Sequence, residues 1–329
     1  MKPPYDITPN ILKLISAISE RIGEINSRFL DRPSPQLRKK NKIKTIHNSL
    51  KIEGNTLNEE QITRLIENKR VLGPQKDIKE VLNAIDIYDN LDAFNPMSEK
   101  SFLKAHKILM HDLIKDAGKY RSESVGIAKA NKLAHLAPPF KNVPYLMKDL
   151  FKYLKDPDEL TLIKSCVFHY EMEFIHPFLD GNGRMGRLWQ TLILHQEYEV
   201  FEYLPFESLI SQTQEEYYSV LSKCDKTGKS TLFIEYILSV ILDTISELLN
   251  FNNRILSQEE RLHYFISKNK NEFSRKDYMN VFKNISSATA SRDLKIGIEK
   301  GLLEKTGELN KTVYKIKTRH NQEISGITN

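Results

Sequence analysis

The chain has 329 residues, which is long for one domain and sufficient for two domains with separate cores. Its composition, 40% hydrophobic and 28% charged, is ordinary for a globular protein and excludes global disorder. The net charge of +6 is concentrated at one end, because residues 255–329 contain 14 Lys and Arg against 9 Asp and Glu. This balance of +5 predicts a basic C-terminal module.

Several classes of protein are disfavoured by what the sequence lacks. Cys166 and Cys224 form no disulfide or metal-ligand pattern and lie in apolar, helix-like segments, so we expect buried reduced thiols. The first residues lack the apolar core of a signal peptide, and the most apolar run, 233–249, contains three acidic residues. We therefore expect no membrane segment and a cytoplasmic location. Phosphate-loop, zinc-helix and nucleophile-elbow motifs are missing.

Apolar residues recur at helical spacing through most of the chain, which predicts an all-α core. Gly54 suits the end of one helix, and Ser98 suits the N-cap of another. The helices are expected at 9–30, 36–53, 58–69, 75–94, 98–116, 144–154, 160–175, 182–199, 206–226 and 230–252.

Residues 119–137 interrupt this helical pattern. Gly118 ends a helix, and the stretch from Tyr120 to Ile127 carries strand-favouring residues in partial alternation. The sequence therefore predicts a short β-hairpin within the helical core.

The last part of the chain has a different pattern. Helices are expected at 257–269, 274–282 and 286–301, with Ser274 and Ser286 as N-caps, followed by strands at 302–306 and 312–316. Three helices followed by a hairpin resemble a winged helix, whose third helix would be the recognition helix. We expect that helix to bury Ile285, Ala290, Leu294 and Ile298 and to expose Ser287, Thr289, Ser291 and Arg292. DNA and protein both remain open as partners.

Residues 176–187, with the sequence HPFLDGNGRMGR, lie between two predicted helices. The first N–H groups of the second helix have no intrahelical partner and carry partial positive charge, so an anion suits this position. Gly181 and Gly183 let a ligand approach the backbone, and Arg184 and Arg187 add two cations on one helical face. The arrangement predicts a phosphate-binding site.

Two further side chains of this stretch suggest catalysis. Asp180 is an oxygen donor suited to Mg²⁺ beside substrate phosphates, and His176 has an unperturbed pKa suited to proton transfer near neutral pH. The Asp-Gly and Asn-Gly dipeptides also favour hairpin turns, but no alternating strands flank them. Transfer of a group from a nucleotide is therefore the expected chemistry.

This stretch resembles the Fic family signature, H-P-F-x-[D/E]-G-N-G-R-x-x-R, at every specified position. The resemblance implies a protein adenylyltransferase that moves AMP from ATP to a Ser, Thr or Tyr hydroxyl of a target protein and of itself. It assigns His176 as the base, Asp180 as the Mg²⁺ ligand and five residues to phosphate binding. These five are Gly181, Asn182, Gly183, Arg184 and Arg187.

Two other segments resemble features of the same family. Ser49 and Glu53 fit the inhibitory motif [S/T]-x-x-x-E-[G/N], on an inhibitory helix at about 36–54 that precedes the core. We expect Glu53 to take the Arg187 guanidinium bidentately and to block productive ATP binding. The predicted hairpin matches the family's flap, which would hold the target through Tyr120, Arg121, Val125, Gly126 and Ile127.

We therefore expect a catalytic core at 1–254, a winged-helix module at 255–318 and a tail at 319–329. Transfer of another phosphate-containing group, removal of AMP and a nucleotide-sensing DNA-binding regulator remain alternatives. A homodimer is also open, and the sequence identifies neither the target protein nor the modified residue type.

Overall fold

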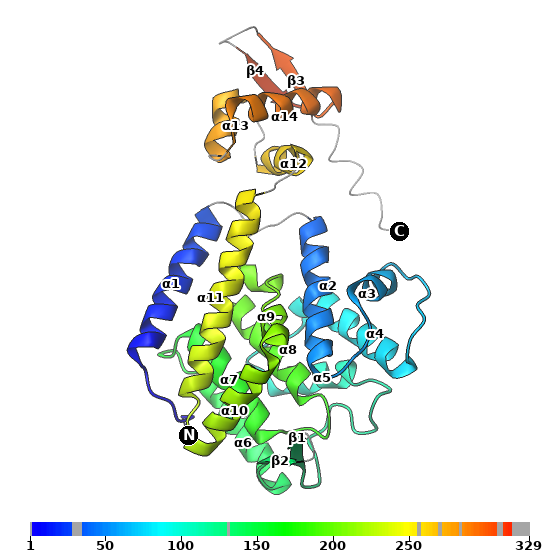
Figure 1. Ribbon diagram of the computed structural model, residues 1–329, viewed down its shortest axis with the longest axis vertical. Helices are drawn as coiled ribbons and strands as arrows, with labels where there is room; N and C mark the ends of the chain where they lie inside the picture. Colours follow the sequence, from blue (N-terminus) through cyan, green and yellow to red (C-terminus); the bar gives the residue numbers. More distant parts are fainter. Residues whose placement is uncertain are drawn as a thin grey trace. The chain divides into compact units, whose positions relative to one another are not determined.

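The computed structural model describes residues 2–27, 35–129, 132–254, 258–268, 272–282, 285–307 and 312–317. Its elements are almost all helices, which confirms the predicted all-α core with a hairpin (Figure 1). The chain forms two compact units, Met1–Ser246 and Glu247–Asn329. The predicted boundary at 254/255 is the end of helix α11, whereas the units divide earlier, within that helix.

The first unit contains ten of the described α-helices and most of an eleventh, α11, which continues into the second unit. They are α1 (Pro9–Ser27), α2 (Pro35–Ile52), α3 (Glu59–Ile66), α4 (Gln75–Asp89), α5 (Glu99–Leu109), α6 (Val143–Leu154), α7 (Thr161–Ile175), α8 (Asn182–His195), α9 (Glu207–Gln212), α10 (Gln214–Thr227) and α11 (Thr231–Arg254). Short 3-10 helices occur at Leu91–Ala93, Phe140–Asn142 and Glu199–Glu202.

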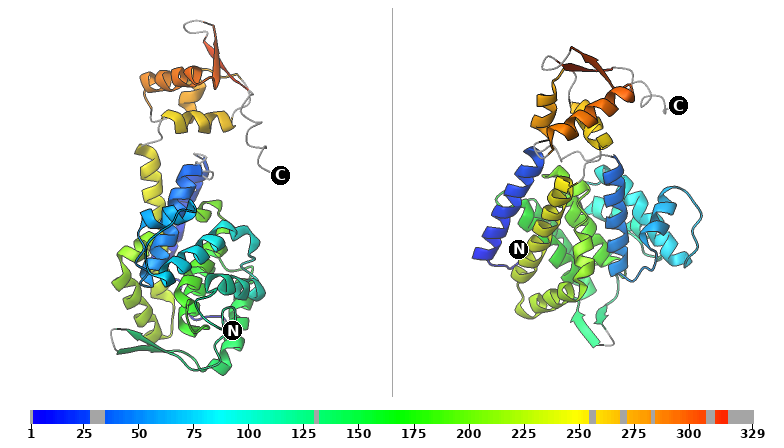
Figure 2. Two further views of the ribbon diagram at one scale, coloured as in Figure 1. Left: turned by 90° about the vertical axis from the view of Figure 1, so that its right-hand side faces the viewer. Right: turned by 45° about the horizontal axis from the view of Figure 1, so that its top comes forward.

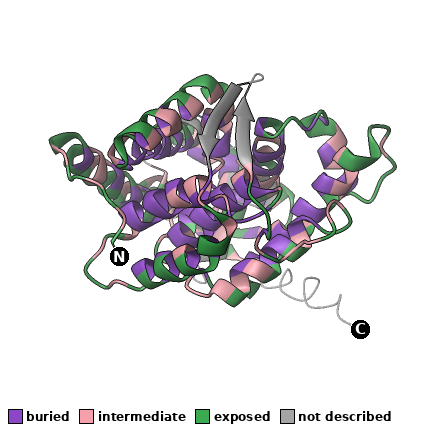
Figure 3. Ribbon diagram, turned by 90° about the horizontal axis from the view of Figure 1, so that it is seen from below, coloured by how far each residue is buried: buried purple, intermediate pink, exposed green. Residues whose placement is uncertain are grey.

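Helices α7 and α8 form the centre of this unit and are buried along most of their length. In Figure 3 buried stretches run through the middle of the unit, and exposed ones lie at its rim. Gly186 permits this close packing, because a Cβ there would lie 2.8 Å from His169 Cδ2. His169 is itself buried between Gln190 and Tyr217, at 2.7 and 3.0 Å. The residues around the predicted site therefore sit in the core.

Helix α2 packs against α9, α4 and α8. Its buried residues include Ile43, Ile46 and Leu50, whose spacing of three and four places them on one helical face. Ser49 is buried on the same side and brings the predicted inhibitory segment to the core.

Strands β1 (Gly126–Lys129) and β2 (Lys132–Leu136) form the predicted hairpin, which projects beyond the helices in Figure 2. They are antiparallel, with Gly126 opposite Leu136 and an irregular register between Ile127 and Ala128. The strand begins at Gly126 rather than near Tyr120. Before it, the Arg121 N–H donates to the carbonyl of Pro177, just after the end of α7, and not to a neighbouring strand.

The second unit contains α12 (Gln258–Lys268), α13 (Arg275–Val281), α14 (Ser287–Glu299), β3 (Leu303–Thr306) and β4 (Val313–Ile316). This is the predicted element order of a winged helix, and Ser274 and Ser286 are N-caps as expected. Ala290 and Leu294 of α14 are buried, and Ile285 and Ile298 pack against the same core. The sequence did not predict the buried Asp293, whose carboxylate accepts hydrogen bonds from Arg261 and Tyr278.

Some predicted boundaries were wrong. The helix expected at 206–226 is divided at Thr213, whose hydroxyl donates to the Leu209 carbonyl and whose backbone leaves the helical region. Helix α5 ends at Leu109 rather than at 116, and Asp112 takes a positive φ of 59° soon after. None of the described helices combines the length and apolarity that crossing a bilayer requires. The predicted tail at 319–329 lies outside the described residues.

Candidate active site

The 176–187 stretch is a helix-loop-helix joint, as predicted: α7 ends at Ile175 and α8 begins at Asn182. Two left-handed residues shape the loop, His176 with φ 49° and Gly181 with φ 85°. A Cβ on Gly181 would lie 2.7 Å from Met110 Sδ, so glycine is required there for both backbone and packing reasons.

Asn182 fixes the loop internally. Its Oδ1 accepts from the Phe178 N–H and its Nδ2 donates to the Phe178 carbonyl, each at 2.9 Å, and the residue is 2% exposed. The side chain is therefore committed to the loop. The predicted contact of Asn182 with a phosphate would therefore be made by its backbone N–H.

Arg121 holds the other side of the loop. Its Nε donates to the His176 carbonyl at 2.8 Å, and its backbone N–H donates to the Pro177 carbonyl at 2.9 Å. Its Nη atoms donate to carbonyls of Glu123 and Pro138, and the residue is 4% exposed. The side-chain donors of Arg121 are thus used on carbonyls of the same chain, and Nε fixes the backbone at His176. The contact of Arg121 with a target stays a prediction.

His106, on α5, contacts the loop at Phe178 and Asp180, and the sequence did not predict this role. Its Nδ1 accepts from the Gly118 N–H at 2.8 Å, so its Nε2 carries the proton donated to the Asp180 carbonyl at 3.0 Å. The ring stacks on Phe178 with centroids 3.5 Å apart, and burial lowers its pKa to about 4. The only sequence signal was a histidine on the apolar face of a predicted helix.

Asp180 combines exposure with two hydrogen bonds. Its side chain is 47% exposed, and its Oδ1 accepts from the Gly181 N–H at 2.6 Å and from Arg184 Nη2 at 3.1 Å. The described residues contain no cluster of three or more His, Cys, Asp or Glu suited to a metal. A single exposed carboxylate still fits Mg²⁺, which commonly takes one or two carboxylates together with substrate phosphates.

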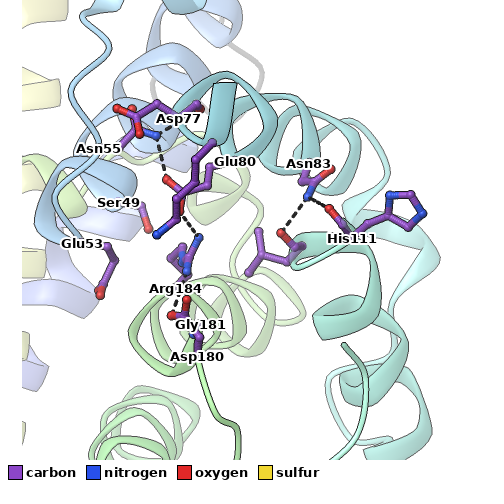
Figure 4. Close-up of polar contacts among 12 residues, drawn as sticks. Ser49, Glu53, Asn55, Asp77, Glu80, Asn83, His111, Asp180, Gly181 and Arg184 are labelled. Atoms are coloured by element: carbon purple, nitrogen blue, oxygen red, sulfur yellow. Dashed lines mark hydrogen bonds and ion pairs between the residues drawn. The ribbon is translucent and has the colours of Figure 1, made fainter. Parts of the chain in front are cut away.

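Arg184 is 4% exposed and lies between two carboxylates (Figure 4). Its Nη2 contacts Asp180, and its Nη1 lies 3.1 Å from Glu80 Oε1 of α4. The guanidinium is therefore fixed from two sides before any ligand is considered.

Arg187 is fully buried and meets the predicted inhibitory segment. Its Nη2 lies 2.7 Å from Glu53 Oε1, and it also donates from Nη2 to the Ser49 carbonyl and from Nε to the Ser49 hydroxyl, at 2.8 and 3.1 Å. The structure thus brings Ser49, Glu53 and Arg187 together. The expected bidentate pair is observed as a single contact through Nη2. Ser49 accepts from Nε and from Nη2, and Nη1 has no hydrogen-bond partner among the described residues.

The Glu53 carboxylate also lies against the start of α8. A Cβ on Gly183 would come within 3.2 Å of Glu53 Cδ and 3.1 Å of Arg187 Nη1. The position at which the sequence predicted an anion is therefore occupied by a carboxylate of the same chain, beside a helix N-terminus and an arginine.

The remaining predicted residues lie at the base of the hairpin. Tyr120 donates its hydroxyl to Glu99 at 3.0 Å and contacts the Phe178 ring, so its side chain faces the core. Val125 is half-buried, and the backbones of Gly126 and Ile127 begin β1. Only the last three keep a main chain available for a target.

Residues 96–194 match the family model described as Fic/DOC family. The chain is 39% identical to a solved Fic family protein from Desulfovibrio desulfuricans G20, with a TM-score of 0.74, covering 97% of this chain and 99% of that one. It is also 29% identical over 203 residues to the protein adenylyltransferase Fic of Nematostella vectensis, covering 56% of this chain.

A third relative, the protein adenylyltransferase fic-1 of Caenorhabditis elegans, is 27% identical over 205 residues that cover 58% of this chain. The chain spans 46% of the Nematostella protein and 38% of the Caenorhabditis one, less than half of each.

Proposed function

The chain belongs to the Fic/DOC family, and we propose on that basis that it transfers AMP from ATP to a hydroxyl group of a protein. The observation that carries the proposal is the composition of one loop and helix start, where a histidine, an acidic residue, first-turn N–H groups without intrahelical acceptors and two arginines occur within residues 176–187. The curated relatives named protein adenylyltransferase support the same activity.

In the proposed reaction the target hydroxyl attacks the α-phosphorus of ATP and pyrophosphate leaves. A bond forms between the hydroxyl oxygen and phosphorus, the bond to the bridging oxygen breaks, and His176 Nε2 or Nδ1 takes the hydroxyl proton. Arg121 would orient that histidine through its carbonyl. N–H groups at the start of α8, with Arg184 and Arg187, would stabilise the charge on the phosphates.

Asp180 would hold Mg²⁺ in this proposal, because its carboxylate is half-exposed and precedes the start of α8 by two residues. The ion would neutralise charge on the phosphates when bound. The Arg184 contact to Asp180 Oδ1 shows that the carboxylate already balances a cation.

We also propose that Glu53 inhibits the transfer. It occupies the donor of Arg187 and the space over Gly183 that an outer phosphate would need. Nucleotide would then bind without aligning its α-phosphorus with the target hydroxyl. A carboxylate in that space also suits a reversed reaction, so AMP removal remains an outcome of the test.

The hairpin would hold the target by main-chain hydrogen bonds, which need an extended segment and little sequence specificity. Among the described strands β1 pairs with β2 alone, so its other edge has no strand partner there. The modified residue would be any Ser, Thr or Tyr that such pairing places beside His176.

The test uses the Glu53→Gly chain with Mg²⁺ and ATP labelled at either the α- or the γ-phosphate. Label from the α-phosphate alone should appear in protein, and mass spectrometry should find AMP on a hydroxyl. Label from the γ-phosphate would instead indicate phosphate transfer, and no label from either would refute group transfer from ATP. A pre-modified target that loses AMP would support removal.

For the second unit we propose DNA binding through α14. Its support is the balance of +5 in residues 255–329 and the exposure of Arg292 and Lys295 on α14. Binding of the full chain to duplex DNA should weaken steeply with salt and with Arg292→Glu. Salt-independent or absent binding would favour a protein partner.

A further inference from the structure

Glu80 is a buried carboxylate with a partner on each oxygen. Its side chain is 7% exposed, its Oε1 lies 3.1 Å from Arg184 Nη1, and its Oε2 accepts from Asn55 Nδ2 at 2.8 Å (Figure 4). Lys76 approaches Oε1 only to 3.9 Å and is 69% exposed. The sequence motifs assigned no role to this residue.

Asn55 connects this carboxylate to the end of the inhibitory helix. It is two residues after Glu53, is 8% exposed and donates also to the Asp77 carbonyl at 3.1 Å. Its Oδ1 accepts from the Leu57 N–H at 3.1 Å. The chain that leaves α2 is therefore attached to α4 directly after the residue that contacts Arg187.

We infer that Glu80 is a positioning residue of the phosphate-binding site: one oxygen fixes the Arg184 guanidinium, and the other, through Asn55, fixes the chain end that carries Glu53. This inference rests on the proposed function. Arg184 and Arg187 are thereby coupled to a single element, α4, although each meets a different carboxylate.

The charges explain why the position requires a carboxylate. Arg184 is almost completely buried, and a buried cation without a close anion is strongly disfavoured. Asp180 is half-exposed and is also the proposed metal ligand, so it cannot be reserved for Arg184. Glu80 can keep Nη1 in place while Nη2 exchanges Asp180 for a phosphate oxygen.

The first test measures nucleotide affinity in Glu53→Gly and Glu53→Gly/Glu80→Gln. The glutamine keeps an oxygen for Asn55 but turns an amide N–H₂ toward Arg184. If Arg184 contacts the phosphates that ATP has and AMP lacks, the Kd for ATP should rise about tenfold and the Kd for AMP less than twofold. Equal weakening of both ligands would indicate a merely structural role and overturn the inference, as would unchanged ATP affinity.

The second test measures AMP incorporation in Asn55→Asp, made in the wild-type and the Glu53→Gly chains. The aspartate can still accept from Leu57, but it opposes Glu80 with a second carboxylate. Incorporation should rise several-fold in the wild-type background and not at all in the Glu53→Gly background. Wild-type incorporation in Asn55→Asp would overturn the connection to Glu53.

Asp86→Asn is the matched control, since Asp86 is an exposed residue of the same helix whose carboxylate, among the described residues, has a hydrogen bond from Asn90 and none from either arginine. It should change neither measurement. If Glu80→Gln fails to unfold cooperatively, Glu80→Asp replaces it, since it keeps the charge but cannot span both partners. If Glu53→Gly transfers AMP and the other variants change nothing, this inference alone fails; if Glu53→Gly transfers nothing, the proposed function fails.

Discussion

Arg184 and Arg187 are three positions apart on one helix and both are buried, but the carboxylates that pair with them differ in access to water. The Glu80 side chain is 7% exposed and lies inside α4, whereas the Glu53 side chain is 31% exposed and follows the last residue of α2. Gly54, with φ 90°, then turns the chain away. One pair is therefore closed to water, whereas the other is partly open to it, as the proposed exchange of Glu53 for an outer phosphate requires.

The difference assigns separate tasks to two chemically identical side chains. In our proposal the buried pair, with both carboxylate oxygens used, fixes geometry, and the pair at the helix end, with one contact, regulates access. Replacing His176 removes the proposed base and leaves both arginines in place. Replacing Glu53 and then Ser49 removes contacts of Arg187, with a smaller expected effect for Ser49.

The largest effect is expected for His176→Ala in the Glu53→Gly chain, in which neither arginine is altered. AMP transfer should fall ~10²- to 10⁴-fold, because the base acts on the target hydroxyl. ATP affinity measured by calorimetry should stay within a few-fold, since both arginines remain. Full transfer by the double variant would refute the assignment of His176.

Glu53→Gly alone should raise self-modification at least tenfold, because Arg187 and the space over Gly183 become available to a phosphate. A tenfold change needs only ~1.4 kcal/mol, which a partly shielded ion pair can supply. Glu53→Asp should be intermediate, since it keeps the charge and loses reach. Equal label incorporation by wild type and Glu53→Gly would exclude inhibition by this residue.

These two predictions show how far the sequence reaches. The 176–187 loop could be predicted because its glycines, arginines and flanking helices are contiguous in the chain. Ser49 and Glu53 were assigned only through the family motif, since 134 residues separate Glu53 from Arg187.

Contacts without such a motif were missed. Glu80 meets Arg184 across 104 positions, and His106 meets the Asp180 carbonyl across 74. Each is one polar residue on an otherwise ordinary helix face, which local periodicity cannot distinguish from a solvated residue. The same holds for Arg121, whose motif match suggested a target contact while its donors bind backbone carbonyls.

A third carboxyl group, that of Glu207 on α9, is influenced by the Arg187 charge and should make the stability of the fold depend on pH. Burial raises its pKa to about 8 from 4.5, more than the Arg187 charge lowers it. Between these values the folded chain keeps a proton that the unfolded chain releases, so the free energy of unfolding should fall as pH rises from about 4.5 to 8, by up to ~1.4 kcal/mol per pH unit.

Denaturant unfolding of wild type and Glu207→Gln at several pH values measures this effect. The variant cannot ionise, so its stability should be flatter than that of wild type over this pH window. Parallel profiles would show that folding does not raise the pKa of Glu207.

The smallest effect is expected for Ser49→Ala, which removes the hydroxyl acceptor of Arg187 Nε and keeps the carbonyl acceptor of Nη2. A buried donor left without its acceptor costs roughly 1–3 kcal/mol, part of which relaxes as the guanidinium turns. Turning weakens the alignment of Nη2 with Glu53, so self-modification should rise a few-fold, less than in Glu53→Gly.

Ser208→Ala is the matched control for this change. The Ser208 hydroxyl, on α9, accepts from Asn48, the neighbour of Ser49 on α2, and has no hydrogen bond with Arg187 among the described residues. It should leave label incorporation at the wild-type level. In the Glu53→Gly chain, Ser49→Ala should not raise self-modification further, because Arg187 Nη2 no longer has the Glu53 carboxylate as a partner. An additional rise there would mean that Ser49 restrains Arg187 independently of Glu53. AMP transfer would then be inhibited by two separate contacts to Arg187, where we infer one.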